Sequence, residues 1–280
     1  MTSDHHIHMV LDGVQWRSAI ARHAQTPDTG WIHRILTQYR EKGYTYLRDG
    51  GDKWGVSAYA RSVAKDYGIT YRTPLAPISK AGHYGGFIGL QYETEKDYVN
   101  LVKKQKAQGA DFIKIMISGL MDFDRFGVLT EPALEGQEIA TLIHIAHEEG
   151  FAVMAHANGA RTVEAAAIAG VDSVEHGAYL DAEALQAMKE AGTVWVPTLS
   201  TVGNLRGKGR FPESAVSKIL ESALENVETF GKMGGLIGCG TDAGAWAVPH
   251  GCNTEESLLA LAGITPGQLA EADRIIKEKF

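Results

Sequence analysis

The segment Asp4-His5-His6-Ile7-His8 opens the first of eight strand-like segments and sets the pattern that decides the fold. Successive side chains of an extended strand point to opposite faces, so His6 and His8 share one face and His5 and Ile7 the other. We expect His6 and His8 to point inward beside Asp4, and His5 to point outward towards helices. Two imidazoles on one face can hold a divalent ion, although a mobile, histidine-rich N-terminus would also account for the pair taken alone.

Strand-like and helix-like segments alternate along the whole chain. The predicted strands cover residues 6–11, 44–48, 69–77, 112–117, 152–155, 171–175, 193–197 and 236–240. The predicted helices cover residues 31–41, 58–65, 95–108, 136–149, 160–169, 182–191 and 213–232, and a helical tail covers 265–280. Such alternation indicates parallel strands joined by crossover helices, and eight units match a (β/α)8 TIM barrel. Two doubly wound domains are the alternative, but the chain has no Pro-rich or Ser-rich linker near its middle and no Gly-x-Gly-x-x-Gly after a strand. We therefore predict an α/β fold in which residues 1–280 form a single barrel domain.

Composition narrows the class of protein. The chain has 280 residues, of which 44% are hydrophobic and 22% charged, as in ordinary soluble globular proteins. Its net charge of −7 argues against a nucleic-acid groove. No apolar stretch approaches the ~20 residues that span a bilayer. With two cysteines and no secretory signal, we expect a cytoplasmic protein that acts on a small molecule, not on nucleic acid or a membrane, and a homo-oligomer is compatible with the sequence.

Residues of metal-ligand type recur at the ends of the predicted strands. His156 and His176 end the fifth and sixth strands, and Asp242 follows the eighth. In a (β/α)8 barrel this end carries the catalytic groups. Lys114 lies inside the fourth strand, where an unpaired ammonium is costly to bury. The alternatives are two satisfied core histidines, an aspartate that caps the turn at Gly244, and a lysine that reaches the rim along apolar surface.

Five segments in this order and spacing resemble the metal-dependent amidohydrolase superfamily, and within it the prolidase-like group related to Xaa-Pro dipeptidases and imidazolonepropionase. They are Asp4-His5-His6-Ile7-His8, Gly109-Ala110-Asp111-Phe112-Ile113-Lys114-Ile115, Met154-Ala155-His156-Ala157, Gly170-Val171-Asp172-Ser173-Val174-Glu175-His176-Gly177 and Gly240-Thr241-Asp242-Ala243-Gly244. The resemblance implies a barrel of the amidohydrolase type with two divalent metal ions, for which Zn2+ is the expected ion. It also implies the ligands: His6 and His8 for the first ion, His156 and His176 for the second, and Lys114, carboxylated on its amine, as the bridge.

The same resemblance implies a role for Asp242. It would complete the first metal site, take a proton from a metal-bridging hydroxide as this attacks the substrate, and pass the proton to the leaving amine. The implied function is a metal-dependent hydrolase that cleaves the amide (C–N) bond of a small substrate such as a dipeptide or an N-acyl amino acid. A lactonase or phosphotriesterase with the same centre, and a non-catalytic metal-binding or ligand-binding barrel, are the alternatives.

Loops after the strands supply the candidates for substrate contact. The candidate substrate-binding residues are Arg48, His83, Tyr84, Tyr179 and His250. An ion pair between Arg48 and Asp49 is the structural alternative for the first of them. Residues 120–132 and 200–211 are polar, rich in glycine or arginine-bearing, and are predicted to act as lids. Their arginines could pair with a substrate carboxylate, solvated arginines being the alternative: Arg125, Arg206 and Arg210.

Little sequence flanks the predicted barrel. Only Met1, Thr2 and Ser3 precede the first motif, and a short helical tail follows the last strand. The prolidase-like relatives usually carry a β-rich domain built from residues on both sides of the barrel. We therefore expect a barrel that lacks this flanking domain, either as a barrel-only member or as a chain whose flanking segments are absent from the sequence.

Overall fold

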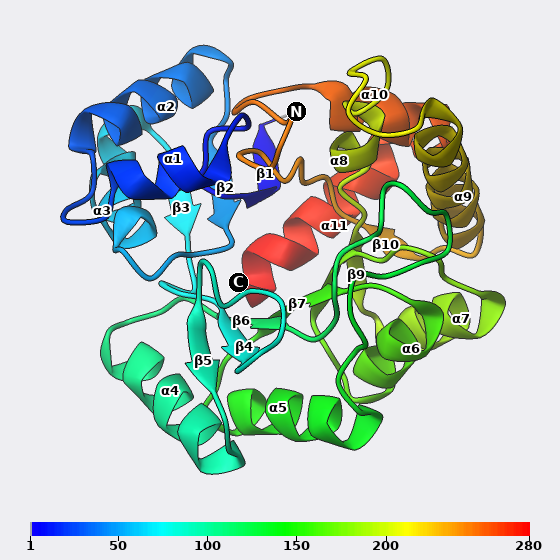
Figure 1. The fold of residues 1–280 in the computed structure, drawn as a ribbon, viewed down its shortest axis with the longest axis horizontal. Coiled ribbons are helices and arrows are strands. Elements are labelled where there is room, and N and C mark those ends of the chain that lie inside the picture. Colours follow the sequence, from blue (N-terminus) through cyan, green and yellow to red (C-terminus); the bar gives the residue numbers. More distant parts are fainter. Residues whose placement is uncertain (1) are drawn as a thin grey trace.

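The computed structural model describes residues 2–280, in which strands and helices alternate as predicted (Figure 1). The strands are β1 (Ser3–Ile7), β2 (Tyr46–Asp49), β3 (Thr70–Arg72), β4 (Ile78–Lys80), β5 (Leu90–Tyr92), β6 (Ile113–Met116), β7 (Val153–Ala157), β8 (Ser173–His176), β9 (Val194–Val196) and β10 (Leu236–Ile237). The helices are α1 (Trp16–Arg22), α2 (Thr29–Glu41), α3 (Val56–Ala64), the short 3-10 helix η1 (Lys65–Tyr67), α4 (Glu95–Ala107), α5 (Gly136–Glu148), α6 (Ala160–Ile168), α7 (Ala182–Ala191), α8 (Ser200–Gly203), α9 (Glu213–Lys232), α10 (Thr254–Leu261) and α11 (Pro266–Lys279).

The strands are parallel and close into a ring. β1, β2 and β3 pair in that order, and β4, β6, β7, β8, β9 and β10 form a second run. Individual hydrogen bonds join the first run to the second: the amide of His5 donates to the carbonyl of Cys239 at 3.0 Å, and the amide of Asp242 to that of His6 at 2.7 Å. The first and last strands, more than 200 residues apart in sequence, are thus neighbours.

The third position of the ring is filled by two short strands. The predicted strand 69–77 was too long: β3 ends at Arg72 and pairs with β2, while β4 begins at Ile78 and pairs with β6. Pro74 and Pro77 lie between them, and Leu75 has a φ of 67°. Because proline has no amide hydrogen to donate, a regular ladder cannot continue through this stretch. β3 and β4 together count as one position, so the ring has eight and the predicted (β/α)8 barrel is confirmed.

Helix boundaries were predicted better than strand boundaries. All seven predicted helices and the helical tail are present, with bounds that differ by two residues or fewer. The sequence interpretation missed α1, α8, α10 and the edge strand β5, which are short elements in the connections. β1 lies three residues earlier than expected, so His8 stands just beyond its end. These differences decide which side chains reach the centre of the ring.

Helix α11 closes one end of the barrel. Its Ala272 and Ile276, with the following Phe280, pack among Phe112, Met154, Val194 and Val196 inside the ring, and α11 crosses the middle of the view in Figure 1. Phe112 precedes β6, and Asp172, which pairs with Lys279 at 3.0 Å, precedes β8. The plugged end is therefore the one where the strands begin, which leaves the opposite end for a site. No helix among residues 2–280 is long and apolar enough to cross a membrane.

Candidate metal centre

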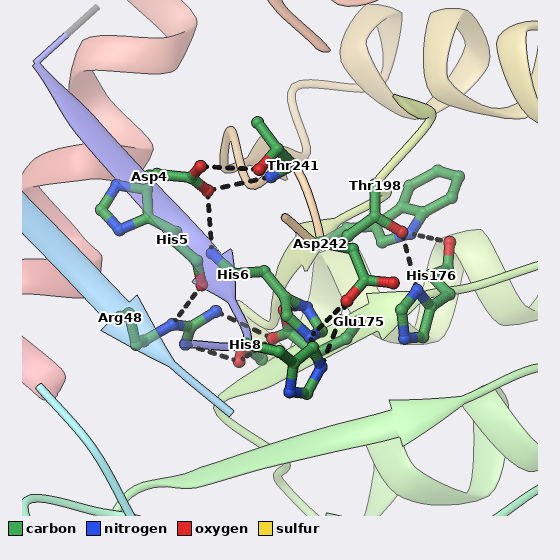
Figure 2. Close-up of polar contacts among 12 residues, drawn as sticks. Asp4, His5, His6, His8, Arg48, Glu175, His176, Thr198, Thr241 and Asp242 are labelled. Atoms are coloured by element: carbon green, nitrogen blue, oxygen red, sulfur yellow. Dashed lines mark hydrogen bonds and ion pairs between the residues drawn. The ribbon is translucent and has the colours of Figure 1, made fainter. Parts of the chain in front are cut away.

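Three residues from the first and last strands of the ring face one another (Figure 2). The Nε2 atoms of His6 and His8 lie 3.3 Å apart, and Asp242 Oδ1 lies 3.4 Å from the first and 3.2 Å from the second. Within residues 2–280 this is the one group of three or more His, Cys, Asp or Glu side chains whose ligand atoms approach within 4.8 Å of one another. Asp242 Oδ1 is buried and has no hydrogen-bond partner among these residues. Two ring nitrogens and an unsatisfied carboxylate oxygen that converge in this way fit a divalent cation.

The group is held by the seam that closes the barrel. Asp4 accepts hydrogen bonds from Thr241 Oγ1 at 2.6 Å, from the Thr241 amide at 2.9 Å and from the His6 amide at 3.2 Å. Burial raises the pKa of the Asp4 carboxyl to about 7, although the hydrogen bonds from Thr241 oppose the shift. Asp4 therefore fastens the strand that carries both histidines to the loop that carries Asp242. His5 points the other way, as predicted, and its Nε2 lies 2.9 Å from Asp273 of α11.

His156 and His176 lie next to this group but outside it. Their ring centroids are 4.6 Å apart, and the ring of His176 is 5.1 Å from that of His6. His176 Nδ1 is 2.7 Å from Thr198 Oγ1, and His156 Nε2 is 3.2 Å from the carbonyl oxygen of Gly119. Each ring therefore has one nitrogen engaged with the protein and can turn the other towards a ligand.

Lys114 lies among these histidines with its charge unpaired. The side chain is buried, and its Nζ has no hydrogen-bond partner among residues 2–280. The pKa of this amine is lowered to about 8, mainly by burial; Arg48 acts in the same direction, and Glu175 and Asp242 oppose the shift. An unpaired buried amine surrounded by imidazoles fits a group that gains a further substituent or ligand, because a bare ammonium would remain unsatisfied there.

Three histidines of the centre, His6, His156 and His176, are held in the neutral form. Burial, with the positive charge of Lys114 as the next cause, lowers the pKa of His6 to about 4 and that of His156 to about 3. Burial and the neighbouring histidines also lower the pKa of His176. Burial alone would raise the pKa of Asp242, but its interactions with His6, His8 and Lys114 outweigh burial and lower this pKa. At neutral pH the site therefore offers imidazole lone pairs and a carboxylate, which is the state that binds metal.

Strained strand ends bring side chains to the centre that simple alternation would turn away. Glu175 and His176 are consecutive, so a regular strand would place them on opposite faces. His176 has a φ of 71°, Thr198 a φ of 48° and Asp242 a φ of 59°, all in the left-handed region. Such conformations cost about 1–3 kcal/mol each in residues other than glycine and cluster at functional sites. The turn at His176 is what allows Glu175 and His176 both to serve the centre.

The prediction that Arg48 contacts substrate was wrong. Its side chain is completely buried, and its guanidinium donates to the carbonyl of His5 at 2.7 Å, to Ser173 Oγ at 2.9 Å and to Glu175 Oε1 at 2.8 Å. The structural alternative of a pair with Asp49 was also wrong, because the charged partner is Glu175 on the far side of the ring. Each of the three guanidinium nitrogens thus donates a hydrogen bond within the protein.

The prediction for His250 was wrong as well. This residue is 3% exposed, its Nε2 lies 2.9 Å from the carbonyl oxygen of Leu11, and its Nδ1 lies 3.2 Å from the hydroxyl of Tyr39. Burial lowers the pKa of His250 to about 4, so the ring is neutral. With both nitrogens engaged, His250 ties the last loop to the first one and has no donor or acceptor left for a substrate.

The remaining substrate candidates lie around the centre. The ring of Tyr84 is 4.8 Å from that of His156, and His83 Nδ1 is 3.5 Å from Glu131 Oε1. Tyr179 packs its ring 5.4 Å from that of Phe126. A small pocket next to His176 has walls that are otherwise without charge, formed by Met121, Ala178, Tyr179, Pro197, Leu199, Val202, Ile219 and Ala223. Contact of His83, Tyr84 and Tyr179 with substrate stays a prediction.

The two predicted lids meet each other above the pocket. Phe123 of the first segment lies 5.3 Å from Phe211 of the second, between ring centroids, and Phe211 lies 6.2 Å from Trp246. The lid arginines all contact nearby side chains: Arg125 pairs with Asp122 at 2.6 Å, Arg206 lies 3.7 Å from Glu213, and the guanidinium of Arg210 lies over the ring of Trp246 at 4.3 Å. The second segment begins as helix α8, which was not predicted.

Sequence reasoning missed several residues that shape the centre. Glu175 was quoted only as the neighbour of His176, although its Oε2 lies 2.7 Å from His6 Nδ1. Asn158 holds the loop beside His156, because its Nδ2 donates to the Gly119 carbonyl at 3.0 Å and its Oδ1 accepts from the Ala178 amide at 3.0 Å. Gly50 leaves room for the ring of the candidate metal ligand His8, since a Cβ at Gly50 would lie 2.5 Å from His8 Cε1. A buried acid next to a strand-end histidine was the one signal in the sequence that could have pointed to Glu175.

The chain is similar to known proteins over most of its length. The profile of the Amidohydrolase family matches residues 28–271. Ochratoxinase of Aspergillus niger is 30% identical over 261 residues, which is 86% of this chain and 53% of that protein. An uncharacterised protein of Mycobacterium tuberculosis is 27% identical over 241 residues, 81% of this chain and 61% of its own length. The chain thus spans little more than half the length of these relatives.

Solved structures share the fold. A Xaa-Pro dipeptidase with bound methionine superposes with a TM-score of 0.76 at 23% identity, over 95% of this chain and 71% of that one. The crystal structure of the Aspergillus niger ochratoxinase gives a TM-score of 0.76 at 23% identity, over 97% of this chain and 69% of that one. Because the family profile covers well over half of the chain, from just before α2 into α11, the protein belongs to the amidohydrolase family.

Proposed function

We propose that the protein is a metal-dependent hydrolase that cleaves an amide bond in a small substrate with an apolar side chain, such as a dipeptide or an N-acyl amino acid. One observation carries the proposal: His6 Nε2 and His8 Nε2 converge on Asp242 Oδ1 within 3.4 Å, beside the unpaired amine of Lys114. Membership of the amidohydrolase family supports it. The names of two similar proteins, an ochratoxinase and a Xaa-Pro dipeptidase, are consistent with hydrolysis of this kind.

The candidate ligands divide into two groups. His6, His8 and Asp242 would hold one divalent ion, and His156 and His176 a second, with Lys114 carboxylated on its amine as the bridge between them. The set of imidazoles and carboxylates suits Zn2+. Bound ions of this kind lower the pKa of water enough to supply hydroxide at neutral pH, and they polarise the carbonyl under attack.

Asp242 would move the proton. Its Oδ1 accepts no hydrogen bond from residues 2–280, and its lowered pKa keeps it ionised at neutral pH. A carboxylate in this state can accept a proton from the attacking water and return it to the nitrogen of the leaving amine. His83, Tyr84 and Tyr179 would position the substrate around this atom.

The pocket beside His176 has apolar walls and is nearly closed. Its volume of about 10 Å3 would hold about one water molecule, so a substrate side chain could enter only if the lid segments that contribute Met121 and Val202 moved apart. In the opened pocket a charged side chain would lose its hydration without gaining a partner, whereas an apolar one would be stabilised by about 25 cal/mol for each Å2 buried. We therefore expect N-acyl leucine or phenylalanine to be cleaved faster than N-acyl aspartate or lysine.

The experiment combines metal analysis with a substrate panel. Purified protein should contain about two metal equivalents and hydrolyse N-acyl amino acids or dipeptides, in preference to lactones and aryl phosphotriesters tested beside them. Asp242→Asn should lower kcat by roughly 10²- to 10⁴-fold while most of the metal is retained, because the amide oxygen can still face the ion. Asp52→Asn, a change of a buried carboxylate that bonds only to residues 54–57, is the matched control and should keep its activity.

Two outcomes would overturn the proposal. Preferential turnover of a lactone or a phosphotriester would assign the centre to another bond. Metal-replete protein that binds the panel compounds without hydrolysing any of them would instead indicate a binding barrel.

A further inference from the structure

We infer that Glu175, held by Arg48 and Ser173, is a positioning residue that fixes the tautomer of His6 so that its Nε2 lone pair faces the metal site. The inference deepens the proposed function and rests on its metal centre. It gives a role to the one fully buried ion pair of an arginine and a glutamate among residues 2–280, which the chemistry described so far does not use.

The hydrogen bonds of Glu175 occupy one carboxylate oxygen and leave the other to face His6. Glu175 Oε1 accepts from Arg48 at 2.8 Å and from Ser173 Oγ at 2.6 Å. Glu175 Oε2 lies 2.7 Å from His6 Nδ1. The second nitrogen of the guanidinium also donates to Ser173 Oγ, at 2.9 Å, so the serine hydroxyl has its own hydrogen turned towards the carboxylate. These bonds fix the carboxylate in one orientation, with Oε2 directed at the imidazole.

The ionised state of Glu175, paired with Arg48, determines which nitrogen of the His6 imidazole carries the hydrogen. An ionised carboxylate can only accept, so His6 Nδ1 must carry the hydrogen and Nε2 must carry the lone pair. Figure 2 shows His6 between Glu175 on one side and the His8 and Asp242 side chains on the other. A ligand histidine whose second nitrogen donates to a carboxylate is a more basic ligand with a fixed ring orientation.

The arrangement joins strands that are distant in sequence. His6 belongs to β1, Arg48 to β2, and Ser173 and Glu175 to β8, and each of the four side chains is at most 1% exposed. Arg48 also donates through its Nε to the carbonyl of His5, the residue before the ligand. The Arg48 guanidinium therefore fixes both the backbone next to His6 and, through Glu175, the His6 ring. Neutralising the charge of Glu175 alone would not require the bond to the backbone.

The test is a variant that keeps the shape of Glu175 but replaces one of its two acceptor oxygens by an NH2 donor. In Glu175→Gln, either the amide NH2 faces His6 and drives the hydrogen to Nε2, or it faces Arg48 and Ser173 and meets two donors. We expect the Nδ1–H tautomer for His6 in the metal-free parent protein and a shift towards Nε2–H in the variant, measured by 15N NMR of labelled histidine. Zinc affinity, measured by competition with a chelator, should fall by roughly 10- to 100-fold.

Two further variants keep the test decisive. Ser173→Ala removes one donor to Glu175 with minimal change in volume, and it should weaken zinc binding in the same direction by a smaller factor even where Glu175→Gln does not fold. Asp52→Asn, which alters an equally buried carboxylate with no contact to a candidate ligand, should leave both zinc affinity and the His6 tautomer unchanged.

The outcomes separate this inference from the proposed function. Parental zinc affinity and an unchanged His6 tautomer in both Glu175→Gln and Ser173→Ala would overturn the positioning role, even if the protein is an amidase. A protein that cleaves none of the amides but loses zinc affinity and changes tautomer in Glu175→Gln would refute the proposed function and leave the positioning role supported.

Discussion

Lys114 is the residue whose surroundings differ most from those of an ordinary lysine. It lies in the fourth position of the ring and is buried. Its Nζ has no hydrogen-bond partner among residues 2–280, although Arg48, Glu175 and Asp242 are near enough to affect its pKa. The cost of such an amine is tolerated in natural proteins mainly where function requires it. Carboxylation would replace the unsatisfied cation by an anion between the candidate metal positions, which is the role proposed for it.

Replacing Lys114 by methionine should separate function from stability. Lys114→Met has nearly the length of lysine and no charge, so we expect the metal-free protein to gain about 1–3 kcal/mol in its free energy of unfolding. The same change should lower the metal content of the purified protein from two equivalents towards one or none. Urea unfolding in chelator and elemental analysis are the measurements. A destabilised variant that retains two ions would show that Lys114 is a structural residue.

His250 predicts a pH dependence that does not involve the metal centre. Its pKa in the folded protein, about 4, lies below the 6.5 of an unperturbed histidine. Between these values the unfolded chain binds a proton that the folded protein does not, so His250 lowers stability as the pH falls from 6.5 to 4. His250→Asn should remove this contribution and flatten the profile by up to about 1.4 kcal/mol per pH unit. Urea unfolding of both metal-free proteins at pH 7.5, 6 and 5 measures it, and parallel profiles would contradict it.

At the scale of elements, the strand ends and the loops after them determine access to the centre. The segments around Phe123 and Phe211 contact each other through their aromatic rings, and Trp246 from the last loop joins them. Met121, Val202 and Leu205 of the same segments are buried in an apolar cluster. Residues 124–127 and 206–210 are exposed. The exposed parts of the two segments can open without breaking that cluster, whereas movement of the whole segments would expose it.

Removing the ring of Phe211 should loosen the lid. Phe211→Ala deletes both aromatic contacts, which we expect to lower the free energy of opening by about 1–2 kcal/mol. Proteolysis in the open state should then accelerate by roughly 5- to 30-fold, at the exposed sites Arg206, Lys208 and Arg210. Mass spectrometry after brief trypsin treatment measures the rate. Ile168→Ala, an exposed apolar change on α6, is the control, and equal rates in all three proteins would show that Phe211 does not hold the segment closed.

At the scale of the whole molecule, the barrel is filled from one end and carries the candidate metal centre at the other. α11 and Phe280 close the end where the strands begin, a layer of ionic residues with Arg48 and Glu175 follows, and the candidate ligands lie above it. The ring of Phe280 lies 4.5 Å from the Arg48 guanidinium and 5.3 Å from the ring of Phe112. The apolar plug excludes water from beneath the ion pair, which strengthens its electrostatic interactions.

Truncating Phe280 tests the plug. Because the ring is 5% exposed and packed inside the barrel, Phe280→Ala should lower the free energy of unfolding by about 3–5 kcal/mol. Leu261→Ala, at a site that is 71% exposed, should change it by less than about 0.5 kcal/mol. Both are measured by urea unfolding at pH 7.5. A loss below about 1 kcal/mol for the phenylalanine would show that the plug is not part of the cooperative core.

The sequence by itself determined the alternation of strands and helices, and with it the barrel. Apolar spacing is a local property, so helices such as α7 and α9 were predicted with their observed bounds. The convergence of His6, His8 and Asp242 could also be anticipated, because strand ends of one barrel meet at one face. That residues 1–280 form one hydrolase domain, and that Lys114 is carboxylated, stay predictions.

Only the tertiary structure decided what lies next to each strand-end residue. From the sequence, Arg48 and His250 were predicted to be loop residues near a pocket. In the closed ring, Arg48 instead contacts Glu175, 127 residues away, and His250 contacts Leu11, 239 residues away. Asp4-His5-His6-Ile7-His8 specifies two inward imidazoles, but not which nitrogen of His6 faces the metal site. That choice depends on a carboxylate from the opposite side of the barrel, and contacts between distant strands leave no periodic trace in the sequence.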